Sequence, residues 1–371
     1  MEPYVPEKLP PKFIDWEMHI SLIGKANYSL AQYNGILQGI INPQVLLSPL
    51  MVREAVISSR IEGTQASLED VLQYEADIDD LNENGGPEDK YNKDIHEIRN
   101  YRKAMSAAVV KLGERPLSIN LIKDLHRILL SDVRGQNKDP GEIRRRQNWI
   151  GSPGTPIENA TFVPPDPFII LDALSDWEAY IHKEEKDITV QLALIKAQFE
   201  LIHPFLDGNG RIGRMLVPLV LYDKKMLSEP TFYISSYFEK NRDIYYDRLH
   251  AISQERDWNG WISFFLQALI EQSSENSRKA KEIINLYNNM KDKISSIRNQ
   301  YPIRALDAIF SKPIFSATYF GSRLGQSKMT ANRVLRELME EGIIIVISES
   351  SGSRPTIFAF PQLLNITEGV E

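Results

Sequence analysis

The stretch His203–Arg214, HPFLDGNGRIGR, decides how this sequence is interpreted. It lies between two apolar segments with helical spacing, LALIKAQFELI before it and MLVPLVLYD after it. Three glycines and an asparagine allow the connecting backbone to adopt left-handed or tightly curved conformations. Successive N–H groups can then form a concave nest at the start of the following helix, where the helix dipole also favours an anion. The stretch therefore predicts an anion-binding turn between two helices.

The polar residues of this stretch are the types that phosphoryl-type transfer requires. Arg211 and Arg214 are three apart and can both reach back over the helix start to phosphate oxygens. Asp207 is a hard oxygen ligand for Mg²⁺ shared with phosphates, and His203 is the type of side chain that acts as a base near neutral pH. Each feature alone has an ordinary alternative, because a glycine loop can be a plain turn and a histidine before proline can be structural. Together they favour an anion hole, a metal ligand and a base in one loop.

Composition excludes several classes of protein. The 371 residues, 42% hydrophobic and 25% charged, predict two or three domains with proper cores. A net charge of −7 argues against bulk attraction to nucleic acid or membranes, and leaves a local patch open. The chain has no cysteine, which excludes disulfides, thiolate metal sites and cysteine nucleophiles. The first residues do not have the pattern of a signal peptide and no apolar run approaches the ~18 residues of a membrane span, so we expect a cytoplasmic protein.

On both sides of the central stretch, most of the sequence has the spacing of apolar residues that is typical of helices. Residues 1–113 are expected to form an N-terminal helical region, with helices over 46–61, 67–78 and 95–111 and a capping box at Ser67 and Asp70. Residues 114–275 form the expected core. Its helices are predicted over 118–130, 168–182, 190–202, 215–224 and 239–253, with an extended flap over 147–163. Residues 276–300 are expected to be a helical linker.

The last part, residues 301–371, has a different pattern. Helices over 304–310, 317–324 and 327–341 and two strands over 343–348 and 356–360 predict a winged-helix (α+β) domain. Seven basic and five acidic residues over 301–360 give it a charge of +2. Lys328, Arg333 and Arg336 lie on the expected recognition helix over 327–341, and Arg354 lies in the expected wing between the two strands. These are compatible with contacting DNA phosphates, but winged helices also dock proteins, and both interpretations stay open.

The twelve residues from His203 to Arg214 match the Fic-domain signature HPFx[D/E]GN[G/K]RxxR at every specified position. The chain therefore resembles Fic proteins, and the helical framework over about 116–272 and the flap resemble them as well. The resemblance implies a mainly α fold, a Fic-type helical bundle with a β-hairpin flap, followed by the winged-helix domain. It also implies a nucleotidyltransferase, a protein adenylyltransferase that moves AMP from ATP to a Ser, Thr or Tyr hydroxyl of a protein. Gly210 argues against the phosphorylating variant, which carries lysine there.

The resemblance also implies roles for individual residues. His203 would be the catalytic base, and Asp207 would hold the Mg²⁺ cofactor against the phosphates of ATP. The flap would pair with the main chain of the target, and a weaker match places two residues beside the adenine. The implied sets are, for the phosphates, Gly208, Asn209, Gly210, Arg211, Gly213 and Arg214; for the flap, Ile150, Gly151, Thr161 and Phe162; and for the adenine side, Asn241 and Tyr245.

A second motif, SSRIEG over residues 58–63, matches the inhibitory-helix pattern [S/T]xxxE[G/N] of internally inhibited Fic proteins. Ser58 and Glu62 are four apart and share one face of a helix over about 48–63. The Glu62 carboxylate could pair bidentately with Arg214 and occupy the place of the γ-phosphate, so that ATP binds with its α-phosphate misaligned. The ordinary alternative is a helix C-terminus with a glycine stop.

The leading hypothesis is therefore an autoinhibited protein adenylyltransferase, with two alternatives. In the first, Glu62 positions a water and the enzyme removes AMP, alone or as one of two activities. In the second, the chain is a winged-helix DNA-binding regulator whose Fic core senses a nucleotide. The expected partners are ATP, a protein target or the chain itself, and DNA or a protein at the winged helix; no membrane is expected, and family resemblance allows a homodimer.

Overall fold

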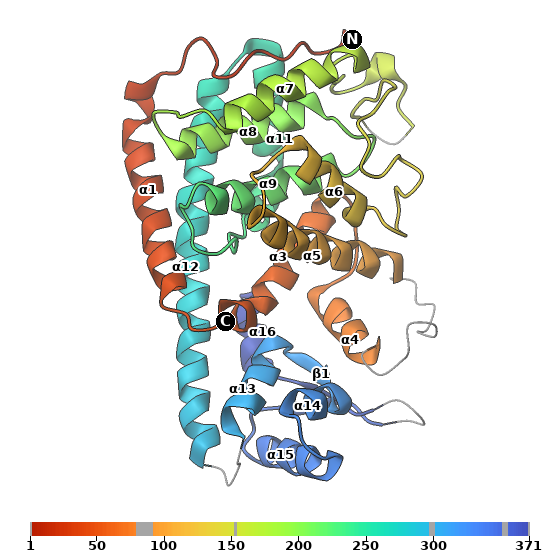
Figure 1. Ribbon diagram of the computed structural model, residues 1–371, viewed down its shortest axis with the longest axis vertical. Coiled ribbons are helices and arrows are strands. Elements are labelled where there is room, and N and C mark those ends of the chain that lie inside the picture. Colours follow the sequence, from red (N-terminus) through yellow and green to blue (C-terminus); the bar gives the residue numbers. More distant parts are fainter. Residues whose placement is uncertain (1, 79–91, 152–153, 297–300, 351–354, 370–371) are drawn as a thin grey trace.

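The computed structural model describes residues 2–78, 92–151, 154–296, 301–350 and 355–369. Two long helices, α1 (Trp16–Gln38) and α12 (Trp258–Ser296), pack along one another at one side of the molecule (Figure 1). Helix α1 buries Ile23, Leu30 and Leu37, which recur at sevens along one face. The sequence analysis did not predict α1, although Asp15 caps it by accepting from the N–H of Met18.

The centre of the molecule is a pair of consecutive helices, α8 (Ile188–Ile202) and α9 (Asn209–Asp223), whose residues are almost all buried. Packed around them are α5 (Asn92–Leu112), α6 (Ile119–Leu129), α7 (Ile170–Ile181) and α11 (Arg242–Glu255). The prediction that the second helix begins at 215 was wrong. It begins at Asn209, because Gly208 adopts φ +78° and turns the chain directly into the helix. Arg211 and Arg214 therefore project from its first two turns.

Of the N-terminal helices, α3 (Ser48–Ile61) packs against α9 and α5, α4 (Leu68–Ile78) packs against α5 and α3, and α2 (Pro43–Leu46) packs against α3. The expected capping box forms at the start of α4, where the Asp70 N–H donates to Ser67 Oγ at 3.1 Å and the Ser67 N–H donates to Asp70 Oδ2 at 2.8 Å. Glu62 is the residue that ends α3. The helix predicted over 239–253 is two helices, α10 (Ser235–Lys240) and α11, separated at Asn241.

In the described part of the flap, Ile150 and Phe162 form an isolated antiparallel bridge. The short helix η1 (Ile157–Asn159) lies between these two residues, and η2 (Pro167–Ile169) follows them. Within the described residues, the expected β-hairpin is thus represented by a single residue pair. Two prolines at 164–165 follow the bridge and lack the N–H that a longer ladder needs.

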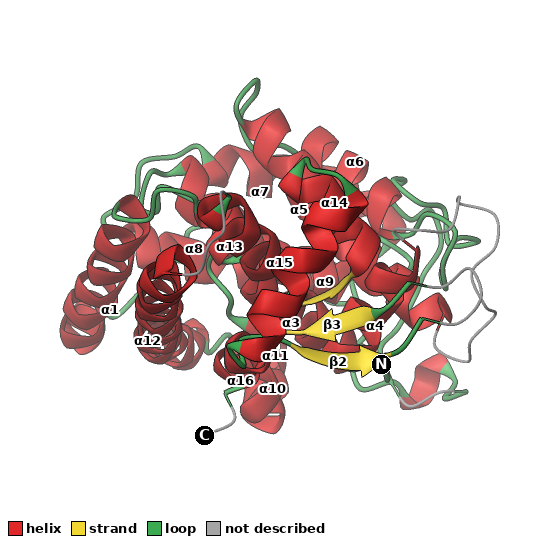
Figure 2. Cartoon of the chain, turned by 90° about the horizontal axis from the view of Figure 1, so that it is seen from below, coloured by secondary structure: helices red, strands yellow, loops and turns green. Residues whose placement is uncertain are grey.

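The C-terminal part contains α13 (Pro302–Ser311), α14 (Ala317–Leu324), α15 (Lys328–Glu340) and α16 (Pro361–Glu368). They accompany a three-stranded antiparallel sheet in the order β1-β3-β2, formed by β1 (Ile314–Ser316), β2 (Ile345–Ser348) and β3 (Ile357–Ala359) (Figure 2). Three helices and two strands were predicted, while β1 and α16 were not. Helix α4 packs against β1, and α16 packs against α3, so this part contacts the N-terminal helices directly. Arg354 lies outside the described residues.

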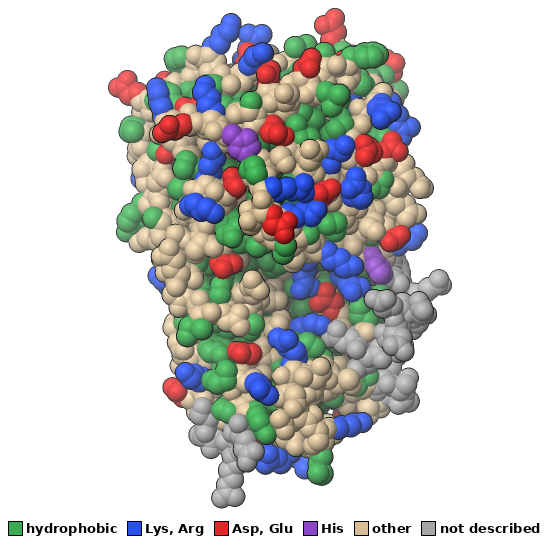
Figure 3. Space-filling model, viewed as in Figure 1, with side chains coloured by type: hydrophobic (Ala, Val, Ile, Leu, Met, Phe, Trp, Pro, Cys, Tyr) green, Lys and Arg blue, Asp and Glu red, His purple; other side chains and the backbone are tan. Residues whose placement is uncertain are grey.

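The chain is mainly helical, as predicted. None of the helices in the described ranges is both long and apolar enough to cross a lipid bilayer. Acidic and basic side chains are interspersed over the face drawn in Figure 3, in keeping with the modest net charge.

Candidate active site

His203 stands at the C-terminal end of α8 in a left-handed conformation, with φ +49°. A carbonyl can only accept a hydrogen bond, so the 3.3 Å contact between Nδ1 and the Glu200 carbonyl places the ring proton on Nδ1. The lone pair is then on Nε2. Burial lowers the pKa of His203 below its ordinary value, and the ring is neutral near pH 7. His203 is thus held in the form that accepts a proton.

The side chain of Asn209 closes the loop that follows His203. Its Oδ1 accepts from the Phe205 N–H at 2.9 Å and its Nδ2 donates to the Phe205 carbonyl at 2.8 Å. Both ends of the amide are therefore committed to the loop. Asn209, one of the predicted phosphate ligands, can meet an anion only through its backbone N–H, which lies in the first turn of α9.

His126, on α6, packs against the same loop and hydrogen-bonds to it. Its ring stacks on Phe205 with centroids 3.8 Å apart. Nδ1 accepts from the Gly141 N–H at 2.7 Å, so Nε2 carries the proton and donates to the Asp207 carbonyl at 2.8 Å. Burial lowers the pKa of His126 to about 4, which keeps the ring neutral. The sequence analysis did not find His126, because nothing in its local sequence distinguishes it from the other polar residues of α6.

The guanidinium of Arg214 is 1% exposed and is held by the end of α3. Its Nε donates to Ser58 Oγ at 2.8 Å, and its NH2 donates to the Ser58 carbonyl at 2.8 Å and to Glu62 Oε1 at 2.7 Å. The structure thus brings the two motifs together. The expected bidentate pairing is not what forms: Glu62 binds through one oxygen, because Ser58 occupies the remaining donors on that side.

The Glu62 carboxylate lies over the first turn of α9. A Cβ on Gly210 would overlap Glu62 Oε1, so only glycine permits this contact. Burial opposes ionisation of Glu62, but the charge and hydrogen bond of Arg214, helped by Arg211, hold its pKa below the ordinary value. A carboxylate therefore occupies the position in which the sequence analysis placed an anion.

Arg211 is positioned by a carboxylate from α5. Its NH1 lies 3.2 Å from Glu97 Oε2, and both side chains are 1% exposed. Its NH2 lies 3.5 Å from Asp207 Oδ1, and Glu97 also pairs with Arg134 at 3.2 Å. Burial raises the pKa of Glu97, while Arg211 and Arg134 oppose that rise. The sequence analysis missed Glu97, which is 114 residues from Arg211 along the chain.

These observations agree with the comparisons with known proteins. The model described as Fic/DOC family matches residues 116–221, and the model described as Fic/DOC family N-terminal matches residues 20–110. Together they account for more than half of the sequence. The chain belongs to the Fic/DOC family.

Curated Fic relatives match over short stretches. The probable protein adenylyltransferase aq_aa38 of Aquifex aeolicus is 33% identical over 73 residues, which is 19% of this chain and 23% of that protein. The protein adenylyltransferase fic-1 of Caenorhabditis briggsae is 28% identical over 123 residues, 32% of this chain and 22% of that protein. The matched region thus spans less than a quarter of these relatives.

Solved structures share the fold over a greater length. A Fic family protein from Desulfovibrio desulfuricans superposes with a TM-score of 0.58 at 19% identity, covering 97% of this chain and 98% of that one. A Fic domain containing signaling protein from Bacteroides thetaiotaomicron superposes with a TM-score of 0.53 at 20% identity, covering 69% and 97%. These likenesses concern the fold alone.

The two residues expected beside the adenine of a Fic nucleotide differ in position. Asn241 is partly exposed between α10 and α11, and its Nδ2 donates to the Tyr237 carbonyl at 2.9 Å. Tyr245 is 2% exposed and packs among aromatic rings, including Phe238 at 4.7 Å and Trp261 at 6.0 Å. As it stands, Tyr245 has no face open to a ligand. Aromatic residues at helical spacing belong more often to the core than to a ligand site, and that is its place here.

Tyr245 belongs to a buried cluster with Lys196 and Glu200 behind the α9 helix. Lys196 is fully buried, hydrogen-bonds the Tyr245 hydroxyl and lies 3.1 Å from Glu200 Oε1. A Cβ on Gly213 would overlap the Glu200 carboxylate. Gly213, a predicted phosphate ligand, therefore faces this cluster, and a side chain at this position would have to displace the Glu200 carboxylate.

The base of the flap is fixed to the His203 loop by Arg144, a buried residue that the sequence analysis also missed. Its Nε donates to the His203 carbonyl at 2.9 Å and its NH2 donates to the Pro165 carbonyl at 2.5 Å. Asn148 adds a hydrogen bond from Nδ2 to the Phe205 carbonyl at 3.1 Å. Hydrogen bonds thus attach both ends of the flap to the loop that carries the candidate base.

The side chains present fit a magnesium ion that is shared with a nucleotide. Among the described residues, no group of three or more His, Asp or Glu side chains could hold a metal alone. Asp207 is about one-third exposed, and Arg211 and the Gly208 N–H contact only its Oδ1. Its Oδ2 has no hydrogen-bond partner in the described part of the chain. Mg²⁺ is typically bound by one or two carboxylates plus substrate phosphates, and a single carboxylate with a free oxygen matches that pattern.

Proposed function

We propose that this Fic chain is a protein adenylyltransferase, which transfers AMP from ATP to a Ser, Thr or Tyr hydroxyl of a protein or of another part of itself. The observation that carries the proposal is the short loop between two left-handed residues, His203 and Gly208. It connects a neutral imidazole, whose Nε2 has no hydrogen-bond partner among the described residues, to the amide-rich start of α9, the helix that also carries Arg214. The names of the Aquifex and Caenorhabditis relatives support the same activity.

In the proposed reaction, the oxygen of the target hydroxyl bonds to the α-phosphorus of ATP, and His203 Nε2 takes the proton of that hydroxyl. The bond between this phosphorus and the oxygen leading to the β-phosphate breaks, and pyrophosphate leaves with that electron pair. The first N–H groups of α9 and the buried Arg214 stabilise the negative charge of the phosphates. Arg211, fixed by Glu97, orients the Asp207 carboxylate. The Asp207 carboxylate would hold Mg²⁺ together with the phosphates of ATP, and the ion would neutralise part of this charge.

We propose further that Glu62 blocks productive binding of ATP. Its carboxylate lies over Gly210 and takes one NH2 hydrogen bond of Arg214, and a γ-phosphate would need the same donors. The carboxylate is one-third exposed, so it is also able to orient a water for the removal of AMP. Removal of AMP is accordingly the second candidate activity of the same site.

For the C-terminal part we propose a winged-helix docking module. Lys328, Arg333 and Arg336 are exposed on one face of α15, which supports contact with the phosphates of DNA. A gel-shift experiment with and without residues 301–371 tests this binding. ATP as co-substrate and the absence of cysteine are consistent with the cytoplasm, where we place the protein.

The experiment that tests the activity uses ATP labelled at the α- or the γ-phosphate, with Mg²⁺ and cell extract. Label from the α-position on protein, increased in Glu62→Gly and lost in His203→Ala, is the expected result, and mass spectrometry should find a 5′-adenylyl adduct. Label from the γ-position alone would indicate a kinase. A protein that carries AMP and loses it only when Glu62 is present would favour the reverse reaction.

A further inference from the structure

The two edges of the flap differ in what they contact. Ile150 and Phe162 exchange two hydrogen bonds across the bridge, at 2.9 and 3.2 Å. The Thr161 N–H also donates to the Ile150 carbonyl, at 2.8 Å. On the other side of the bridge, the backbone groups of Val163 and Trp149 are directed toward the outer edges, as expected beside such a pair. The outer edge beside Phe162 is occupied by the N-terminal segment, residues 2–7, because the Tyr4 N–H donates to the Val163 carbonyl at 2.9 Å.

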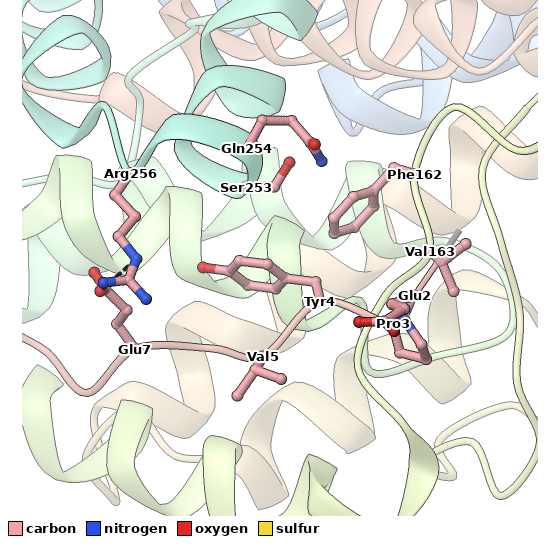
Figure 4. A pocket seen from close by; sticks show the side chains of 10 residues that line it. All are labelled: Glu2, Pro3, Tyr4, Val5, Glu7, Phe162, Val163, Ser253, Gln254 and Arg256. Atoms are coloured by element: carbon pink, nitrogen blue, oxygen red, sulfur yellow. Dashed lines mark ion pairs between the residues drawn. The ribbon is translucent and has the colours of Figure 1, made fainter.

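The Tyr4 side chain reinforces this contact. Its ring lies beside the ring of Phe162, with centroids 5.9 Å apart, and Figure 4 shows both rings on the same side of the segment. A cavity of about 250 Å³ lies between this segment, the flap and the end of α11. The N-terminal segment thus contacts the flap through both a main-chain hydrogen bond and an aromatic side chain.

The same segment is fixed to the helical core independently of the flap. Glu7 Oε1 lies 3.3 Å from Arg256 Nε, the ion pair at the side of the cavity in Figure 4. Glu7 Oε2 accepts from Trp258 Nε1 at 3.1 Å, and the Glu7 carbonyl accepts from Gln198 Nε2 at 2.8 Å. Gln198 is on α8, five residues before His203. The segment therefore links the outer edge of the flap to the helix that carries the candidate base.

Among the residues that the structure describes, none forms a backbone hydrogen bond with the opposite edge of the flap at Trp149, whose indole N–H donates to the Thr155 carbonyl at 2.7 Å. Trp149 and Ile150 are 44% and 40% exposed. Within the described ranges, the backbone N–H and C=O of Trp149 have no hydrogen-bond partner. Asn148, directly before Trp149, is bonded to the His203 loop, so this free edge is continuous with the candidate active site.

We propose that the N-terminal segment is part of the target-binding apparatus: it occupies the Val163 edge of the flap and thereby directs an extended segment of the protein target to the Trp149 edge. The proposal rests on the proposed function. An unpaired strand edge with free donors and acceptors binds an extended polypeptide by β-augmentation, and the hydrogen bonds of Arg144 and Asn148 hold that edge in register with His203. A nucleotide has no row of peptide groups to pair with it.

The first test compares Tyr4→Pro with Tyr4→Ala, both in the Glu62→Gly background. Both variants lose the aromatic ring, but only proline also loses the N–H that bonds Val163. We expect Tyr4→Pro to transfer AMP to protein about 3- to 10-fold more slowly than Tyr4→Ala, the value of one hydrogen bond. The affinity for ATP, measured by calorimetry, should be equal in the two variants, which also verifies that both are folded.

The second test places the photoreactive residue p-benzoylphenylalanine at position 149 or at position 161. After incubation with α-labelled ATP and cell extract, cross-linked products that carry the AMP label should form from position 149 and not from position 161. Labelled products from position 161 alone, or equal transfer by the two Tyr4 variants, would overturn the proposal while leaving the transferase intact. Absence of label in the Glu62→Gly parent would overturn the proposed function and this inference with it.

Discussion

The contact between Glu62 and Arg214 makes a quantitative prediction about ATP binding. Glu62→Gly removes the carboxylate that lies over Gly210, and Glu62→Gln keeps its shape but removes its charge. In both variants the buried guanidinium of Arg214 keeps its two bonds to Ser58, each 2.8 Å long. The substitutions therefore alter one interaction, that between Arg214 NH2 and Glu62 Oε1 at 2.7 Å.

The size of the effect follows from the exposure of the two partners. A hydrogen bond between charged groups contributes about 1.5–3 kcal/mol. Because the Glu62 side chain is 33% exposed, solvent screening reduces this to about 1–2 kcal/mol. ATP must displace the carboxylate, so its affinity should rise about 5- to 30-fold in Glu62→Gly and by less in Glu62→Gln. The unfolding free energy of the nucleotide-free protein should fall by a similar amount.

Calorimetric titration with an ATP analogue that cannot be cleaved between the α- and β-phosphates measures this affinity without turnover. Arg60→Gln is a matched control, because Arg60 is in the same last turn of α3 and pairs at the surface with Glu239 at 3.6 Å. Its affinity for the analogue should equal that of the wild type. Equal affinity in wild type and Glu62→Gly, or an increase in the control as well, would refute the reasoning.

Three further predictions follow from the buried polar groups around the loop. Glu97→Gln leaves the buried Arg211 without its main counter-charge, so urea unfolding should show a loss of about 3–5 kcal/mol, with a raised KM for ATP; an unchanged midpoint and KM would contradict this role. Ser58→Ala removes the acceptor of Arg214 Nε, and the unfolding free energy should fall by about 1–3 kcal/mol, with self-labelling above wild type; stability and labelling equal to wild type would exclude it. Burial lowers the pKa of His126 from 6.5 to about 4. As the pH falls from 6.5 to 4, His126 is therefore protonated in the unfolded chain but not in the folded one, and the free energy of unfolding should fall by roughly 3 kcal/mol. In His126→Asn, urea midpoints measured across this range should lack that component, and the same decline in both proteins would assign it to other groups.

The sequence could predict the candidate site where its parts are local. His203, Asp207, Gly208 and the arginines lie within twelve residues, and their types and spacing carry the interpretation. The supporting residues could not be found in this way, because they come from distant segments. His126 is 81 residues from Asp207, and Arg144 is 59 residues from His203. Their roles depend on tertiary contacts with backbone carbonyls, for which a single sequence has no signal.

The errors in the fold have similar causes. The start of α9 was placed six residues too late, because glycines at 210 and 213 weaken helix propensity. Each glycine lets a carboxylate approach closely, that of Glu62 at position 210 and that of Glu200 at position 213. The strand β1 has only three residues and follows a proline, so it was too short to be recognised by alternation. Tyr245 was expected beside the adenine only from the resemblance to Fic proteins, and in the structure its neighbours on α10 and α12 bury it.

The contacts at the end of α3 indicate how the brake would be released. Arg242 NH2 donates to the Ile61 carbonyl at 3.1 Å, and Arg134 NH2 contacts the Glu62 carbonyl at 3.5 Å, so cations satisfy the last carbonyls of the helix. The side chain of Glu62, in contrast, is attached by one hydrogen bond and is partly exposed. Rotation of this side chain costs less than undocking α3, whose Glu54 is buried and bonded to Ser235. We therefore expect amide hydrogen exchange within α3 to be unchanged when the ATP analogue binds, and increased exchange along the whole helix would show instead that α3 leaves as a unit.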